Sequence, residues 1–190
     1  LTLLNRDFES GTMANWTVVH TSGTAFSING DNAPGNGEGS YSVGSFSGSD
    51  ANKGYTYSNT FSLASNVKYL KFRGSGFAED STGHCNRIID AHMGWDNGCD
   101  GSIDVNFTWT SSYGVDVWYD VSLDVSAYAG QNGCFRAIDN DAAGCGWVGF
   151  DNISQFDAGN NIIFNIASLW TDNGKFGSAI TFDGVNDYVD

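Results

Sequence analysis

The sequence of 190 residues has little basic charge, a single proline and no long apolar segment. Lysine and arginine together number 8 against 22 acidic residues, which gives a formal net charge of −14. Such a charge repels phosphate backbones and anionic headgroups, so nucleic acid and acidic membrane surfaces are not expected partners. No apolar run approaches the roughly 20 residues that cross a bilayer, so membrane insertion is not expected either.

Catalytic motifs are also scarce. The sequence contains no Gly-x-Ser-x-Gly elbow, no His-Glu-x-x-His and no phosphate-binding glycine loop, and its three histidines stand in unrelated contexts. A glycosidase needs two carboxylates facing each other across a cleft. The aspartates are numerous enough to supply such a pair, but each is also explained by a turn or a cation-binding loop. The sequence therefore favours a binding or structural protein over an enzyme.

Cysteine occurs four times and never in a Cys-x-x-Cys or zinc-type spacing. Cys134 and Cys145 flank a segment typical of a turn, and Cys85 and Cys99 bracket another loop. This spacing predicts two disulfides, Cys134–Cys145 and Cys85–Cys99, and an oxidising, secreted location; four reduced, buried thiols are the alternative. Three N-glycosylation sequons, which are compatible with secretion, begin at Asn15, Asn106 and Asn152.

Only three of the 22 acidic residues are glutamates, and nine of the 19 aspartates stand directly beside asparagine or glycine. Short carboxylates in glycine-rich loops suit a hard cation that prefers oxygen ligands, so they indicate Ca²⁺ binding. The alternative is that aspartate simply favours turns. Asp96, Asp100 and Asp104 form one candidate cation loop, although it lacks the regular alternation and the terminal glutamate of an EF-hand.

Alternation of apolar and polar residues is the dominant pattern along the chain. It is clearest over 115–125, where the odd positions are apolar, and it recurs over 103–109. Further strands are expected at 16–20, 24–28, 55–63, 67–73, 86–91, 134–139 and 146–150, with turn-rich loops at 29–40, 44–54 and 92–102. Because no stretch sustains a helical period, the pattern predicts an all-β fold, an antiparallel β-sandwich or jelly roll.

Aromatic side chains outside the core pattern are candidate contacts for a sugar, since sugars stack on aromatic rings. Trp118 lies out of phase with the apolar residues of its strand, Trp95 sits in the acidic loop and Tyr113 ends a strand. The alternative for Trp118 is that a loop or a neighbouring subunit covers it. The tryptophans that fit the phase of the core are Trp16, Trp109 and Trp147.

Residues 5–11, followed by Trp16, resemble the first strand of galactose-binding-like jelly rolls, which include many carbohydrate-binding modules. Residues 124–130, 135–141 and 146–153 resemble the closing strands of those modules, so the resemblance covers residues 1–157. Its order along the chain is specific for the fold but not for the ligand, because such modules vary their loops freely.

The resemblance implies a structural Ca²⁺ that ties the first strand to the last. Its ligands here would be Glu9 and Asp151, with Asp7 and Asp50 as further candidates. The insertion from Cys85 to Asp104 has no counterpart in that family.

A change of composition near residues 157–161 separates residues 1–157 from a C-terminal segment, residues 158–190. Within it, residues 174–190 resemble the start of a laminin-G/concanavalin-like sandwich, which needs far more chain. Two or three strands cannot bury a core alone. Residues 162–190 are therefore expected to join a sheet that they did not start, in their own domain or in a neighbouring copy.

These features predict a secreted, calcium-stabilised, non-enzymatic module for carbohydrate binding or adhesion at a cell surface. The alternative is a structural subunit of an extracellular filament or surface layer, whose C-terminal strands pair into a neighbouring subunit. The pairing of residues 162–190 distinguishes the two hypotheses.

Overall fold

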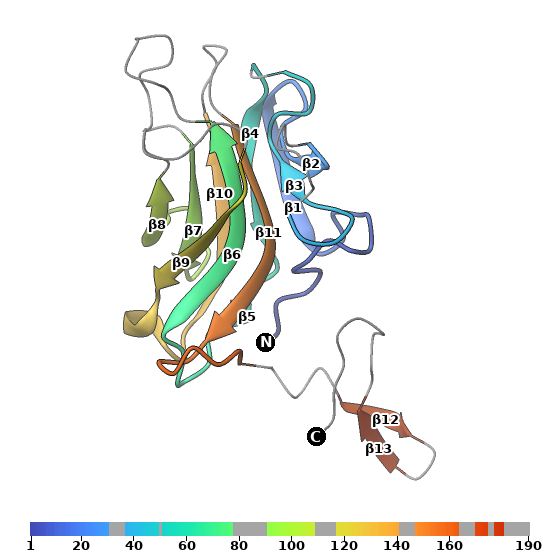
Figure 1. Cartoon of the computed structure of the whole chain (residues 1–190), viewed down its shortest axis with the longest axis vertical. Helices are drawn as coiled ribbons and strands as arrows, with labels where there is room; N and C mark the ends of the chain where they lie inside the picture. Colours follow the sequence, from blue (N-terminus) through green and yellow to red (C-terminus); the bar gives the residue numbers. More distant parts are fainter. Residues whose placement is uncertain are drawn as a thin grey trace.

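The computed structural model describes residues 1–30, 37–49, 51–77, 91–108, 117–140, 147–163, 170–174 and 177–180. In these residues the chain forms an antiparallel β-sandwich of two sheets (Figure 1), which confirms the predicted fold class. The described helical structure amounts to the 3-10 turn Ser126–Tyr128, and no helix in the described part is long and apolar enough to cross a membrane.

The first sheet, sheet A, has the strand order β1-β4-β10-β7-β8, and the short strand β5 also pairs with β10. Its strands are β1 (Trp16–Ser22), β4 (Lys53–Ser58), β5 (Phe61–Ser62), β7 (Ala91–Asn97), β8 (Val105–Thr108) and β10 (Asn132–Asp139). Sheet B has the order β2-β3-β11-β6-β9. Its strands are β2 (Ser27–Ile28), β3 (Val43–Gly44), β6 (Tyr69–Phe77), β9 (Tyr119–Asp124) and β11 (Trp147–Phe156).

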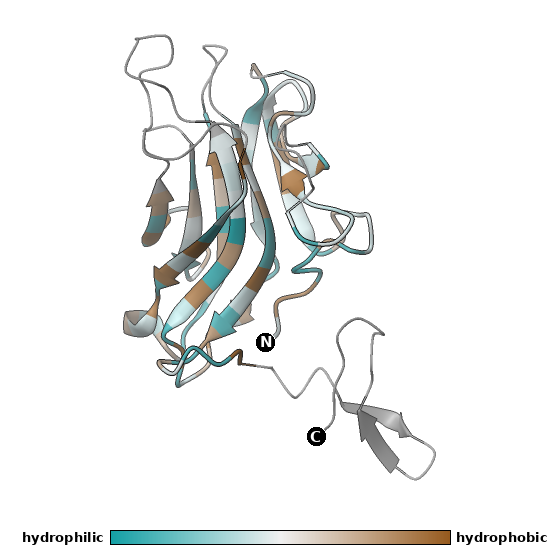
Figure 2. Ribbon diagram, in the orientation of Figure 1, coloured by the Kyte–Doolittle hydropathy of each residue, from teal (hydrophilic) through white to brown (hydrophobic). Residues whose placement is uncertain are grey.

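The alternation seen in the sequence decides which face of each strand enters the core, because successive side chains of a strand point to opposite sides of the sheet. Val121 and Leu123 of β9 are buried, whereas Asp120 and Ser122 between them are exposed. Figure 2 shows the resulting alternation of hydrophobic and hydrophilic residues along the strands. The pattern does not extend to Val117, which is 44% exposed.

An aromatic cluster joins the two sheets. Trp16 and Phe135 come from sheet A, Phe150 comes from sheet B, and Phe8 comes from the segment before β1. The Phe150 ring centroid lies 5.3 Å from that of Trp16, 5.2 Å from that of Phe135 and 5.6 Å from that of Phe8. Trp147 is also buried. The core position predicted for Trp16 is thus confirmed. Trp147 instead alternates with Val148 and Phe150 of the core cluster and packs against Phe46, and Trp109 lies outside the described residues.

The position of β7 differs from the expected strand 86–91 and loop 92–102. The strand is Ala91–Asn97, so it occupies the first half of the predicted loop, and residues 86–90 lie outside the described part. Met93 and Trp95 point into the core, while Gly94 and Asp96 suggested a turn. Gly94 is needed for strand approach, because a Cβ there would lie 2.0 Å from the Val105 carbonyl oxygen of β8.

The first residue of the chain and the end of β11 both hydrogen-bond to Ser62 of the short strand β5. The Ser62 N–H donates to the Leu1 carbonyl oxygen at 3.0 Å, and the Leu1 amino group donates to Ser62 Oγ at 3.2 Å. From β11, the Gln155 side-chain amide donates to the Ser62 carbonyl oxygen at 3.1 Å. The start of the chain and the end of β11 therefore lie at the same end of the sandwich (Figure 1).

The C-terminal segment adds one bridge to the sandwich and a separate hairpin. Ile162 forms an isolated antiparallel bridge with Phe156 of β11. Strands β12 (Trp170–Gly174) and β13 (Gly177–Ile180) pair with each other in a two-stranded sheet.

In the described residues, only the bridge at Ile162 meets the expectation that this segment joins an existing sheet. A local hairpin is entropically cheaper to close than long-range pairing. The laminin-G-like resemblance and the filament hypothesis stay predictions, and residues 181–190 lie outside the described part.

Candidate functional site

The outer face of sheet A carries two tyrosines side by side. Tyr55 and Tyr57 alternate on β4 with the buried Thr56 and Ser58, so both rings project away from the core. Their centroids are 6.4 Å apart and their planes differ by 18°. Both residues are half-buried, so they form an outward-facing aromatic pair on a regular strand.

Arg136 of the neighbouring strand β10 lies over both rings. Its guanidinium carbon is 4.8 Å from the Tyr57 centroid and 5.5 Å from the Tyr55 centroid. A guanidinium at this distance is attracted to the negative face of each ring. The contact restrains both tyrosines, so the aromatic pair is preorganised.

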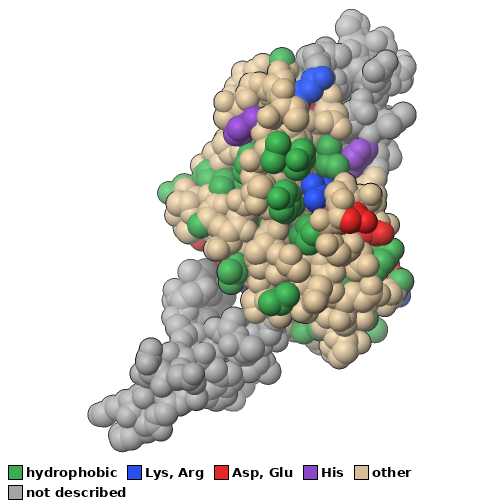
Figure 3. All heavy atoms as spheres, turned by 180° about the vertical axis from the view of Figure 1, so that it is seen from behind, with side chains coloured by type: hydrophobic (Ala, Val, Ile, Leu, Met, Phe, Trp, Pro, Cys, Tyr) green, Lys and Arg blue, Asp and Glu red, His purple; other side chains and the backbone are tan. Residues whose placement is uncertain are grey.

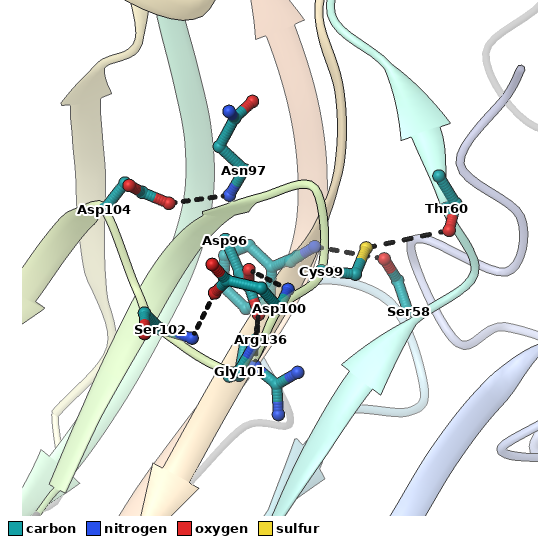
Figure 4. Close-up of polar contacts among 11 residues, drawn as sticks. Ser58, Thr60, Asp96, Asn97, Cys99, Asp100, Gly101, Ser102, Asp104 and Arg136 are labelled. Carbon is teal, nitrogen blue, oxygen red and sulfur yellow. Dashed lines mark hydrogen bonds and ion pairs between the residues drawn. The ribbon is translucent and has the colours of Figure 1, made fainter.

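A buried ion pair in turn fixes Arg136. Its Nε donates to Asp96 Oδ2 at 2.6 Å, and the Asp96 side chain is fully buried. The Asp96 carboxylate also accepts the N–H groups of Asp100 at 2.9 Å and Gly101 at 3.1 Å (Figure 4). The tyrosine pair, Arg136 and the turn after β7 are therefore one connected polar and aromatic unit.

One face of the molecule shows few acidic side chains, although the polar unit itself contains Asp96 and Asp100. The face seen in Figure 3 carries hydrophobic side chains gathered around a basic group, and few acidic side chains appear in this view. Across the sheet, the strand register places Arg136 opposite Gly94, and Gly94 opposite Asn106 of the edge strand β8. Because Gly94 has no side chain, none stands between Arg136 and Asn106 in this row.

The predicted aromatic contacts only partly match this arrangement. Trp95 is 0% exposed and packs edge-on against Phe61 at 5.1 Å, so the prediction that it contacts a ligand is wrong. The reason is that Trp95 belongs to β7 and points into the core. Trp118 is half-buried with a buried indole N–H, and its role stays a prediction. Tyr113 lies outside the described residues.

Sequence reasoning missed Tyr55 and Tyr57, although it predicted a strand there. In the segment 55–58, the small polar residues Thr56 and Ser58 are buried and the large aromatic residues face outward. That reversal of the usual order is visible in the structure and not in the sequence, which is why the pair was missed.

A second site lies where the segment before β1 meets β11. Asp151 is fully buried, and its carboxylate accepts the N–H groups of Glu38 and Asn152, each at 2.7 Å. Glu9 Oε1 accepts the N–H groups of Ser40 at 2.8 Å and Tyr41 at 3.1 Å. Glu9 and Asp151 thus hold the same loop, residues 37–41, from two sides.

The electrostatics of this acidic corner are unfavourable for a bare carboxylate. Burial, with a smaller contribution from the nearby Glu9 and Asp7, raises the pKa of Asp151 to about 8. Within the described part of the chain no lysine or arginine pairs with Asp151. A bound cation would balance this charge, and hard carboxylate oxygens suit Ca²⁺.

No three Asp, Glu, His or Cys side chains among the described residues are grouped so that they could hold a metal ion. A Ca²⁺ in the acidic corner would therefore take at most two carboxylate side chains and complete its shell from carbonyl groups or water, as Ca²⁺ commonly does. Of the four predicted ligands, Glu9, Asp7 and Asp151 share this corner. Asp50 lies outside the described residues.

The predicted second cation loop is not supported. Asp96 is neutralised by Arg136, Asp100 accepts the Ser102 N–H at 2.9 Å, and Asp104 accepts the Asn97 N–H at 2.8 Å (Figure 4). The three carboxylates do not form a metal-binding group. Hydrogen bonds within the loop and the ion pair with the Arg136 guanidinium organise it.

The cysteines also differ from expectation. Cys99 and Cys134 are free thiols, so neither Cys85–Cys99 nor Cys134–Cys145 is present as a disulfide. Instead the pairing of β10 with β7 and the turn that follows β7 bring Cys99 close to Cys134. Their expected partners lie outside the described residues. Among the sequons, Asn15 and Asn106 are exposed, whereas the Asn152 side chain donates to Glu38.

No protein-family model and no curated protein matches the sequence. The structure is similar to that of a family 61 carbohydrate-binding module in complex with β-1,4-galactotriose, with a TM-score of 0.52 and 17% identity over 82% of this chain and 97% of that chain. It is also similar to an arabinose-bound family 51 α-L-arabinofuranosidase, with a TM-score of 0.50 and 18% identity over 88% of this chain but 28% of the enzyme chain.

A third similar structure is the K1 cleaved adhesin domain of Lys-gingipain from Porphyromonas gingivalis W83, with a TM-score of 0.47 and 17% identity over 80% of this chain and 96% of that domain. At these identities the comparisons concern the fold. The chain has a jelly-roll fold like that of carbohydrate-binding modules, as its sequence resemblance predicted.

Proposed function

We propose that this chain is a non-catalytic extracellular module that binds a neutral glycan on the outer face of sheet A. The observation that carries the proposal is the pair of outward tyrosines, Tyr55 and Tyr57, restrained by Arg136. The apolar face of a pyranose stacks on such rings, and neighbouring polar groups bind its hydroxyls. Adhesion to a glycan-bearing surface is the role that this binding would serve.

Arg136 can supply hydrogen bonds to those hydroxyls as well as restrain the rings. Its Nε is committed to Asp96, whereas its terminal nitrogens donate no hydrogen bond within the described residues. Arg136 is 6% exposed, so these nitrogens would reach a sugar at the edge of the tyrosine pair. Guanidinium N–H groups are suitable donors for oxygen acceptors held in a plane.

A neutral glycan fits the charge of the molecule better than an anionic one. The formal charge of −14 repels uronic acids and sulfated sugars at long range. Arg136 does not offset this repulsion locally, because Asp96 neutralises it. The family 61 module with a similar fold was solved with β-1,4-galactotriose, which makes β-1,4-galactan the first polysaccharide to test.

The binding proposal is tested by affinity electrophoresis and titration calorimetry against β-1,4-galactan, arabinan and arabinoxylan. We expect Tyr57→Ala and Tyr55→Ala each to weaken binding by roughly 10-fold or more, as for a central aromatic contact. Tyr69→Ala is the matched control, because Tyr69 is also half-buried but lies on β6 of sheet B. Equal affinity of all three variants and the unmodified chain, or binding to none of the polysaccharides, would reject the site.

The non-catalytic part of the proposal has a separate measurement. Incubation of the chain with the same polysaccharides should release no reducing sugar. If reducing sugar is released even after further purification, and replacing an aspartate or glutamate abolishes this release, the chain is a hydrolase.

We also propose that Ca²⁺ binds in the acidic corner through Glu9 and Asp151 and stabilises the fold. A ligand that binds only the folded state raises stability by mass action, by about 2.7 kcal/mol at 100 times its Kd. Thermal melting with Ca²⁺ should therefore give a higher midpoint than melting with a chelator, and Mg²⁺ should have a smaller effect. Identical midpoints with Ca²⁺ and chelator would reject the ion.

A further inference from the structure

The turn that follows β7 brings a second cysteine to Cys134. The strand register places Cys134 of β10 opposite Asp96 of β7. After Asp96 the chain folds back, because the Cys99 N–H donates to the Asp96 carbonyl oxygen at 3.3 Å and the Gly98 N–H donates to the Asn132 carbonyl oxygen at 2.9 Å. The Cys99 and Cys134 thiols consequently lie close enough for Cys99 to affect the pKa of Cys134.

The two thiols have different access to solvent. Cys134 is fully buried, whereas Cys99 is partly exposed. Burial, followed by the interaction with the nearby Cys99, raises the pKa of the Cys134 thiol. An external oxidant therefore reaches Cys99 first, and Cys134 is placed to react next.

A metal-binding role for this pair has no support in the described residues. No third His, Cys, Asp or Glu side chain is grouped with the two sulfurs for metal binding. The other polar neighbour of Cys99 Sγ is Thr60 Oγ1 at 3.6 Å (Figure 4), and a hydroxyl is not a usual zinc ligand. The nearby Asp96 carboxylate is committed to Arg136.

We propose that Cys99 and Cys134 form a disulfide bond with each other when the protein matures in an oxidising compartment. The Cys99 thiolate attacks an external disulfide and releases one thiol, leaving a mixed disulfide on Cys99. The Cys134 sulfur then attacks Cys99 Sγ and releases the second thiol. The two cysteines together lose two protons and two electrons, which the external disulfide takes up as it becomes two thiols.

This bond would lock the polar unit that holds Arg136 over the tyrosine pair. It joins the turn that presents Asp96, Asp100 and Gly101 to the strand that carries Arg136. Reduction should therefore lower the thermal midpoint, by roughly 5–10 °C for a bridge closing a loop of this length in a chain of this size. The proposal does not depend on glycan binding.

The positions of lysine and arginine make the linkage easy to map. Trypsin cleavage after Arg73, Arg87, Arg136 and Lys175 places Cys85 in peptide 74–87, Cys99 and Cys134 together in 88–136, and Cys145 in 137–175. The full chain is refolded with oxidised and reduced glutathione, its free thiols are blocked in denaturant at acidic pH, and it is digested. Non-reducing mass spectrometry then identifies the linked peptides.

A Cys99–Cys134 bond leaves peptide 88–136 unlinked, unblocked and lighter by two hydrogens than its reduced form. The pairing expected from spacing, Cys85–Cys99 with Cys134–Cys145, would instead join all three peptides and overturn the proposal. Blocking reagent on both Cys99 and Cys134 would overturn it as well.

Two variants make the assignment independent of peptide mapping. In Cys99→Ala, we expect Cys134 to become reactive once the protein is unfolded, whereas it should be unreactive in the unfolded parent. Cys85→Ala/Cys145→Ala is the matched control and should retain the loss of two hydrogens in peptide 88–136. A Cys134 that stays oxidised in Cys99→Ala would contradict the proposal.

Discussion

Two buried aspartates of this sandwich resemble each other in burial and hydrogen bonding but differ in their surroundings. Asp96 and Asp151 are each 0% exposed, and each carboxylate accepts two backbone N–H groups. Asp96 also receives the Arg136 guanidinium. Asp151 has the carboxylates of Glu9 and Asp7 nearby and no cationic partner in the described residues.

The difference shows which of the two buried carboxylates depends on protons or cations from the solvent. Around Asp96 the protein supplies the opposite charge itself, so the polar unit that contacts the tyrosines is complete without any ion. Around Asp151 the described residues supply no opposite charge, so a proton or a metal cation from solution would balance it. Backbone hydrogen bonds alone do not remove the cost of burying a carboxylate.

The largest expected effect comes from breaking the internal pair. Asp96→Ala leaves the Arg136 charge buried without a partner, so we expect the free energy of unfolding to fall by about 3–5 kcal/mol. Urea denaturation measures this change. Asp120→Ala is the control, because Asp120 pairs with Arg73 but its side chain is 89% exposed, and its loss should cost less than about 1 kcal/mol. Similar losses in both variants would mean that Asp96 is not acting as a buried counter-ion.

Asp151→Asn should instead raise the free energy of unfolding of the metal-free protein. The folded-state pKa of Asp151, about 8, lies above its ordinary value, so the folded state holds a proton that the unfolded state has lost. Stability from this group is thus complete below pH about 4 and declines as the pH rises to about 8. With chelator present at pH 8, removing the charge should stabilise the fold by about 1–3 kcal/mol, allowing for the altered hydrogen bonds.

The measurement for Asp151→Asn is denaturant unfolding at several pH values, with chelator and with Ca²⁺. Between pH 4 and 8 the free energy of unfolding of the Asp151→Asn variant should fall less than that of the unmodified chain. Its stabilisation by Ca²⁺ should also shrink. A steeper decline, or an undiminished calcium effect, would contradict this account of the acidic corner.

Two glycines extend the comparison to smaller changes in stability. Gly37 contacts Asp151, and Gly98 follows Asp96 by two residues. Gly37 and Gly98 both have left-handed backbones, with φ of +71° and +79°. A Cβ on Gly37 would lie 2.7 Å from Asp151 Oδ2, whereas a Cβ on Gly98 would meet nothing within 4 Å. Gly98→Ala should cost about 1 kcal/mol of unfolding free energy for its conformation, and Gly37→Ala about 1–2 kcal/mol more. Thermal melts of the two variants check this order, which equal costs would refute.

Much of the fold was predictable because alternation reports directly on burial. Val121 and Leu123 follow the odd positions of the clearest pattern, and Trp16 fits the core phase. The prediction failed for β7 because Gly94 and Asp96 are typical turn residues. There, close contact with β8 and the ion pair to Arg136 outweigh local preference.

The sites were less predictable. Glu9 and Asp151 were identified only through the family resemblance, since 142 residues separate them in the chain and nothing local connects them. Tyr55 and Tyr57 were missed because a sequence does not show that their strand buries threonine and serine. The contact between Cys99 and Cys134 depends on the register of β10 with β7, which spacing does not determine.

The attachment of both ends of the sandwich to Ser62 determines how the module responds to pulling. Leu1 and Gln155 hydrogen-bond to the same residue, so tension applied between the first residues and the end of β11 acts at one end of the sandwich. We expect such a load to break the hydrogen bonds at this end one at a time, rather than to shear whole strands at once. The contacts of Ser62 should therefore give way at low force, while the aromatic cluster around Phe150 remains closed.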